Sequence, residues 1–233
     1  MKASIRKTLL ATTLATALVA GTLASTGAYA DGQDFKRSSA EWWQWALSIP
    51  ESVNPLLDTT GEQCMIGQRG DEWFLAGVGF TAPGPKVRAC SIPEGVTLFF
   101  PVINIINFDT PNACGQGDPL PTSVYRELSA AFIDGSSNLS ASVDGQPIKQ
   151  LHRVRSPVFA VALPEENVFN GPAVCNGTLP AGIYSPAVDE GYYVRLNPLK
   201  VGTHQVKFHA EQLSAGFVQD VTYNLTVVPV ARK

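Results

Sequence analysis

Residues 139–228 carry a series of short segments in which apolar and polar side chains alternate. The segments SPVFAVALP, EGYYVRLNPL, GTHQVKFHAE and VQDVTYNLTVV belong to this series, and tight turns such as Asp144-Gly145 separate them. A period of two is typical of strands with one buried face, and repeated short strands favour an antiparallel sandwich. We therefore expect a mainly β fold, an Ig-like or jelly-roll-like antiparallel β-sandwich.

The segments before this series predict three more strands and a short helix. EWFLAGVGF, residues 72–80, reads as a buried strand, and VRACSIPEG as a short one. VTLFFPVINIINF, residues 96–108, reads as a central strand in which Pro101 marks a bulge. From residue 122, helical spacing predicts a short helix. Its repeating residues are Val124, Leu128, Ala131 and Phe132.

A tryptophan-rich segment, SSAEWWQWALSIP, predicts an N-terminal helix. Ser38 and Glu41 have the spacing of a capping box, and the helix should end before Pro50. Helical spacing puts Trp42 and Trp45 on one apolar face, which favours packing on a core. Trp43 lies at the flank of this face, so it is the tryptophan expected to be exposed.

The first thirty residues have the form of a cleaved signal peptide. Three basic residues precede an apolar run, which ends in the small-residue sequence AYA. We expect cleavage after Ala30, export to the periplasm or the medium, and no membrane span afterwards; an uncleaved anchor is the alternative. Residues 31–233 should form one domain, in which residues 139–233 are a candidate Ig-like sub-domain.

The chain contains four cysteines, and the expected export implies an oxidising compartment. We favour the disulfides Cys64–Cys90, across a hairpin-like segment, and Cys114–Cys175, between two glycine-rich loops. The other connectivities stay open. A structural metal site is the alternative, but no CxxC spacing is present.

The charge of the chain argues against two classes of partner. The full chain has 17 basic and 20 acidic residues, and loss of the predicted signal peptide leaves 14 basic ones. A mildly acidic protein of this kind is a poor binder of nucleic acid or of anionic membranes.

Motifs for common catalytic chemistry are missing from the sequence. There is no G-x-S-x-G and no H-E-x-x-H. Strand alternation should point His204 and His209 to opposite faces, so they do not form a metal pair. We expect no metal and no cofactor, although DTTGE and DGSSN offer clustered oxygens for calcium. Paired carboxylates could serve a glycosidase; the candidates are Asp58, Glu62, Asp71, Glu72, Asp109 and Asp118.

Polar side chains within apolar runs, and aromatic rings that alternation turns outward, are the candidate binding residues. Buried polar groups must be hydrogen-bonded, so such residues either tie loops down or line a pocket. Alternation turns either Tyr192 or Tyr193 away from the core. The candidate ligand-binding residues are Trp43, Asp58, Gln68, Arg88, Asn104, Asn107 and Tyr192.

Two long segments, WWQWALSIPESVNPLLDTTGEQCMIGQRGDEWFLAG and RACSIPEGVTLFFPVIN, resemble a group of bacterial exported proteins of unknown function. The segment SPAVDEGYYVRLNPLKVGTHQVKF also resembles the late strands of Ig-like extracellular domains. The resemblance implies a secreted, largely β domain and implies no reaction.

We thus expect a secreted, non-catalytic protein that binds an extracellular ligand or an envelope component, with glycan as a candidate. The alternatives are an exported hydrolase or lyase that acts on a polymer with paired carboxylates, and a structural accessory protein. Exposed aromatic rings would favour binding, and a cleft with converging ionisable groups would favour catalysis.

Overall fold

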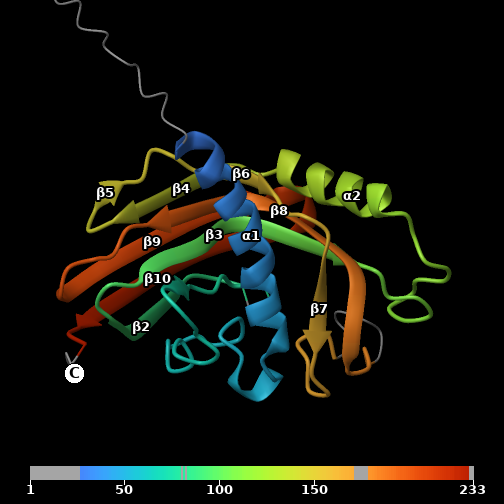
Figure 1. Ribbon diagram of the computed structural model, residues 1–233, viewed down its shortest axis with the longest axis horizontal. Coiled ribbons are helices and arrows are strands. Elements are labelled where there is room, and N and C mark those ends of the chain that lie inside the picture. The colour runs from blue at the N-terminus through green and yellow to red at the C-terminus, as the bar shows by residue number, and fades with distance from the viewer. Residues whose placement is uncertain (1–26, 80, 82, 171–177, 231–233) are drawn as a thin grey trace, which may run out of the picture.

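The computed structural model describes residues 27–79, 81, 83–170 and 178–230, which form two β-sheets and two α-helices (Figure 1). The helices are α1 (Gly27–Ser48) and α2 (Thr122–Asp134). The first sheet contains β1 (Glu72–Phe74), β3 (Thr97–Phe108), β6 (His152–Arg155), β7 (Phe159–Leu163) and β8 (Gly182–Leu196). The second contains β2 (Lys86–Pro93), β4 (Ser137–Val143), β5 (Gln146–Pro147), β9 (Gly202–Gln212) and β10 (Phe217–Val228). The expected mainly β, two-sheet fold is confirmed.

The strand order mixes the two halves of the chain. In the first sheet the order is β1-β3-β8-β6, with β7 also paired to β8, and in the second it is β2-β10-β9-β4-β5. Most neighbours pair antiparallel, but β1 pairs with β3 and β2 with β10 in parallel, which the sequence pattern did not predict. Each sheet therefore needs strands from both ends of the chain.

The first sheet is buried on both faces. Phe100 of β3 stacks on Phe208 of β9 at a centroid distance of 5.0 Å, in the core between the sheets. Its neighbour Phe99 stacks on Tyr193 of β8 at 5.1 Å, in a second core beneath α1. Figure 1 shows α1 lying across β3 on the outer side of this sheet. This burial explains the continuous apolar run of β3, since a strand with both faces covered does not alternate apolar and polar residues.

The N-terminal helix is longer than predicted, and the prediction of a capping box at Ser38 is wrong. α1 begins at Gly27, so it includes the predicted cleavage point after Ala30, and it ends before Pro50 as expected. The Ser38 side chain is fully buried and accepts a hydrogen bond from Arg195 Nη2 at 2.6 Å. The hydroxyl therefore binds a strand residue instead of the helix backbone.

Residues 72–80 form a shorter strand than predicted. β1 ends at Phe74, and the buried chain that follows is irregular. Side chains take the place of a partner strand there: Trp42 donates to the Leu75 carbonyl at 3.0 Å, and Arg88 donates to the Ala76 carbonyl at 2.6 Å. These hydrogen bonds satisfy backbone groups that a strand would otherwise pair.

The second helix has the predicted start, but another face of it is buried. α2 buries Tyr125, Ser129 and Ile133, whereas Leu128 is 53% exposed. Two polar contacts fix this rotation: the Tyr125 hydroxyl donates to Asp109, and Asn107 donates to Ser129. Hydrophobic spacing alone could not reveal these anchors.

Other local predictions are confirmed. β3 has its register shift between Pro101 and Ile103, and Asp144 and Gly145 both have positive φ in a tight turn. The disulfide Cys64–Cys90 is present. The pairing Cys114–Cys175 falls partly on residues outside the described part of the chain and stays a prediction. Among the described residues no helix is both long and apolar enough to cross a bilayer.

Candidate functional site

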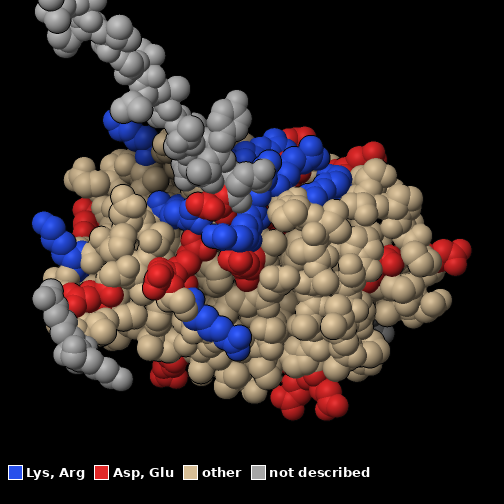
Figure 2. Space-filling model, in the orientation of Figure 1, with Lys and Arg blue, Asp and Glu red and all other residues tan. Residues whose placement is uncertain are grey.

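A groove lies on the surface between α1 and residues 67–74. Its two adjoining parts have volumes of about 420 and 530 Å³. Both parts are lined by Glu41, Arg69 and Glu72. Figure 2 shows that basic and acidic side chains gather around the first turns of α1, while much of the same face is uncharged. We call this hollow the α1 groove.

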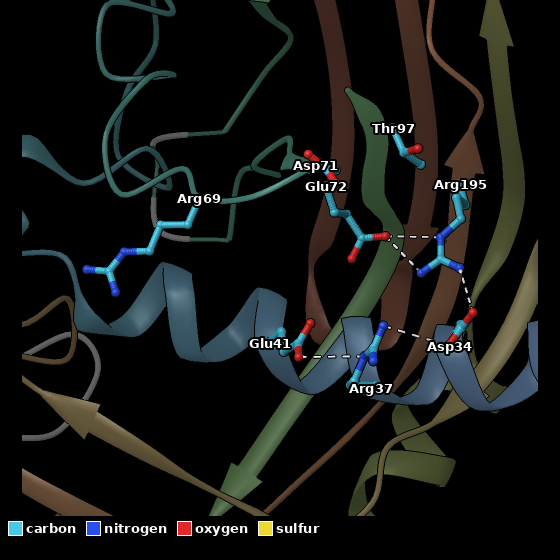
Figure 3. Close-up of a pocket in the computed structure, with 8 residues that line it drawn as sticks. All are labelled: Asp34, Arg37, Glu41, Arg69, Asp71, Glu72, Thr97 and Arg195. Carbon is cyan, nitrogen blue, oxygen red and sulfur yellow. Dashed lines mark hydrogen bonds and ion pairs between the residues drawn. The ribbon is translucent and has the colours of Figure 1, made fainter. Parts of the chain in front are cut away.

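The charged end of the α1 groove is organised by Arg195 (Figure 3). Its Nε and Nη2 atoms lie 3.0 and 2.8 Å from Glu72 Oε1. The guanidinium also lies over the rings of Phe35 and Phe99, at 5.1 and 5.7 Å from their centroids. An arginine held by a carboxylate and two rings loses little freedom when it meets a ligand.

A second arginine in this end is held more loosely. Arg37 lies 3.7 Å from both Asp34 and Glu41, and its side chain is 67% exposed. Exposed ion pairs of this kind contribute little to stability. Glu41 can therefore exchange this partner for a ligand hydroxyl at small cost.

The other end of the α1 groove is aromatic. Trp45 and Phe74 line it together, with ring centroids 5.5 Å apart. The Trp45 indole N–H donates to the Ile66 carbonyl at 2.9 Å, which fixes the ring. A side chain at Gly67 would meet Trp45 and Ile49 at 3.0 Å, so glycine is what permits this close approach. Gln44 and Ser48 complete this end.

Arg69 lies where the two ends meet. Figure 3 shows its guanidinium extending away from the Glu72–Arg195 pair. Within the described part of the chain, no hydrogen bond or ion pair involves this guanidinium, and the residue is exposed. A free cation next to an aromatic surface is available to a ligand.

The structure corrects the prediction for Trp43. This residue is only 6% exposed, and its indole N–H donates to Asp189 Oδ1 at 2.7 Å. The flank of the helix is buried because the outer face of the first sheet also packs against it. Trp43 is therefore no exposed platform. Trp45 lines the α1 groove, but it is itself only 7% exposed, as the helical spacing predicted.

Three predicted binding residues tie down the chain between α1 and β2. Asp58 accepts from the backbone N–H groups of residues 60, 61 and 63. Gln68 donates to the carbonyls of Cys64 and Phe74. Arg88 is 1% exposed and donates to the Asp58, Ala76 and Gly77 carbonyls. Their polar groups are thus engaged in structural hydrogen bonds.

The remaining candidates lie on the first sheet. Asn107 donates to Ser129 and anchors α2. Tyr192 and Tyr193 point to opposite faces of the sheet as alternation predicted, but the face turned away from the inter-sheet core is covered as well, so Tyr193 packs in the second core. Asn104 donates to the Tyr193 hydroxyl at 3.0 Å and also lines a separate pocket. Asn104 and Trp43 are brought together there, whereas the other candidates are dispersed.

Sequence reasoning missed a buried carboxylate beside Trp43. Asp189 is fully buried, and burial raises its pKa to about 7, although hydrogen bonds from Tyr193 and Trp43 oppose the rise. Its Oδ2 atom has no hydrogen-bond partner among the described residues. The signal was an acidic pair, DE, within the apolar strand segment AVDEGYYV.

Of the predicted carboxylates, Asp71 and Glu72 line the charged end of the α1 groove together, whereas Asp58 and Asp109 lie outside it. Burial would raise the pKa of Asp58, but three backbone N–H groups lower it overall. The pKa of Asp109 is lowered by hydrogen bonds from Tyr125 and Gln116. Glu72 is held by Arg195. A general acid instead needs a raised pKa, and the pKa values of Asp58 and Asp109 are lowered.

Two of the three histidines each contact a single carboxylate. His204 lies 2.7 Å from Asp144 Oδ2, which raises the pKa of the imidazole, and it also contacts the Lys200 carbonyl. His209 lies 3.3 Å from Glu211. In the described ranges no three metal-ligating side chains come together.

Comparisons with known proteins return no relative of this chain: no family model, no curated protein and no solved structure matches it. The site must therefore be interpreted from its own chemistry.

Proposed function

We propose that this chain is a secreted, non-catalytic protein that binds an extracellular or envelope glycan in the α1 groove. Sugar rings stack on aromatic side chains through their C–H faces, and their hydroxyls hydrogen-bond to carboxylates, amides and guanidinium groups. The α1 groove supplies both: the half-buried Phe74 ring, which packs against the buried Trp45, at one end, and Glu41, Gln44 and Arg69 beside it.

The observation that carries the proposal is the position of Arg69. Its guanidinium has no partner among the described residues and lies at the junction of the aromatic and charged ends. Arginine recognises planar anions with two parallel hydrogen bonds. The α1 groove therefore suits a glycan that carries an acidic group, with hydroxyls meeting the neighbouring carboxylates.

Two observations support secretion. The N-terminal sequence has the form of a signal peptide, and the disulfide Cys64–Cys90 suits an oxidising compartment. Signal-peptidase cleavage after Ala30 is part of the proposal, and N-terminal sequencing of the exported protein tests it.

Binding can be tested with a panel of soluble neutral and uronate-containing polysaccharides, by titration calorimetry and affinity electrophoresis. We expect binding to at least one acidic polymer and a loss of about tenfold or more in Arg69→Gln, as for removal of a charged hydrogen bond. Lys207→Gln, an exposed cation on β9, should bind normally. If no polymer binds, or if Arg69→Gln binds as well as the parent, the proposal is wrong.

A polymer-cleaving enzyme is the second candidate, because four carboxylates line the charged end: Asp34, Glu41, Asp71 and Glu72. Incubation with the same polymers would then release reducing ends or unsaturated products. Loss of that release in Glu41→Gln and Glu72→Gln, with binding retained, would assign the α1 groove to catalysis.

A further inference from the structure

A second hollow lies between the tryptophans of α1 and the middle of β3. Its volume is about 280 Å³, just below the range of about 300–1,000 Å³ that is usual for ligand sites. The walls are mainly apolar and aromatic; they include Trp42, Trp43, Ile106, Phe132, Phe169 and Phe217. We call this hollow the Asn104 pocket. It shares no lining residue with the α1 groove.

Two polar side chains line the Asn104 pocket, and one of them is fully occupied. Gln219 Oε1 accepts from the Val78 N–H at 3.1 Å. Its Nε2 donates to the carbonyls of Pro101 and Val102, at 3.2 and 2.6 Å. Gln219 thus closes a gap between the two sheets and has little capacity left for a ligand.

Asn104 is different, because a chain of hydrogen bonds fixes its amide in one orientation. The Tyr193 hydroxyl donates to Asp189 Oδ1 at 2.7 Å. Its single proton is then used, so the hydroxyl oxygen must accept from Asn104 Nδ2, which lies 3.0 Å away. The Trp43 indole N–H, which can only donate, binds the same Oδ1 and defines it as an acceptor.

The direction of these hydrogen bonds determines which atom of the Asn104 amide is available to a ligand. With Nδ2 bound to Tyr193, the Oδ1 atom is left as an acceptor with no protein partner in the described ranges. Mainly apolar residues line the pocket beside Asn104, and a carbonyl oxygen with no protein partner favours a molecule that brings a donor over one that can only accept.

We infer that the Asn104 pocket binds a small, mainly apolar ring compound that donates one hydrogen bond to Asn104 Oδ1. The aromatic walls suit a flat ring system, and the volume suits one or two fused rings. A compound of the same shape that can only accept a hydrogen bond would place its acceptor against Asn104 Oδ1, which is also an acceptor. It should therefore bind more weakly. This inference is independent of the glycan proposal.

Two isosteric probes test the donor requirement on the full exported protein. Indole carries a ring N–H, whereas benzofuran has an oxygen at the same position. We expect indole to bind at least three- to tenfold more tightly by titration calorimetry, as for one uncharged hydrogen bond. Saturation-transfer NMR should show the same preference.

Two matched variants locate the effect. Asn104→Leu should reduce the indole preference to about one, while Asn224→Leu, at an exposed position of β10 outside the pocket, should retain it. If Asn104→Leu does not fold, the comparison of indole with benzofuran on the parent protein still tests the donor requirement. The inference is overturned if neither probe binds, if both bind equally, or if the preference persists in Asn104→Leu.

Discussion

The indole of Trp43 and the carboxylate of Asp189 meet at 2.7 Å, although 146 positions separate them in the chain. This contact joins α1 to β8 and lies at the centre of the core beneath the helix. A charged carboxylate in such a place is costly unless donors surround it. Trp43 and Tyr193 supply those donors to Oδ1, and Oδ2 receives none among the described residues.

Asp189→Asn should change how stability depends on pH. The folded pKa of about 7 lies above the ordinary value of 3.8, so between these values the folded state holds a proton that the unfolded state has released. Relative to the charged form, the protonated Asp189 stabilises the folded state fully below about pH 4. This stabilisation is lost as the pH rises through 7. The variant cannot titrate, so its stability relative to the parent should rise by about 2–4 kcal/mol between pH 4 and pH 8.

Urea unfolding at both pH values measures this difference. Asp71→Asn, at an exposed position, serves as the control and should show no comparable gain. Parallel pH profiles for the parent and Asp189→Asn would show that the buried carboxyl does not titrate in this range.

Arg88→Met should destabilise the protein by about 3–5 kcal/mol. The variant removes the donors to the Asp58 and Gly77 carbonyls, and the Tyr223 hydroxyl loses the hydrogen bond that it accepts from Arg88 at 2.8 Å. Thermal and urea unfolding measure the loss. Amide exchange should accelerate first in residues 75–78, and the exposed Arg37→Met should be nearly neutral. Equal stability of the two variants would contradict the role assigned to Arg88.

Gly191→Ala should cost about 1–3 kcal/mol, because the added methyl group would lie 2.6 Å from the Ile103 carbonyl oxygen and from Asn104 Cβ. The backbone of β3 must move to make room, which should also disturb the Asn104 pocket. Gly117→Ala has no neighbour within 4 Å and is the matched control. Unfolding free energies of the two variants test the prediction, and a neutral Gly191→Ala would refute the close packing of β3 and β8.

Strand positions were predictable where the signal is local. β3, β9 and β10 lie where apolar runs or alternation placed them, and the turn at Asp144 was visible as an Asp-Gly pair. Pairing partners were not predictable in this way, because register depends on residues far along the chain. The parallel contact between β2 and β10 left no local pattern.

The candidate site was predicted less well for a related reason. The burial of Trp43 and Tyr193 depends on a helix covering the outer face of the sheet, and alternation in EGYYVRL contains no information on that third layer. Trp45 and Arg69 come together only because Gly67 lets the loop approach α1. Asn104 lines a pocket, which is one of the two roles that the sequence left open for an amide within an apolar run.

The position of β10 has a consequence for the order in which the fold can be assembled. β10 lies between β2 and β9, so the interior of the second sheet is completed by the last described strand. During synthesis β2 leaves the ribosome long before its partner β10 has been made. Until β10 is available, β2 cannot form its native pairing and its apolar residues lack their native contacts. Such distant pairing slows folding, so a nascent chain of this kind would remain open to chaperones until β10 has been made.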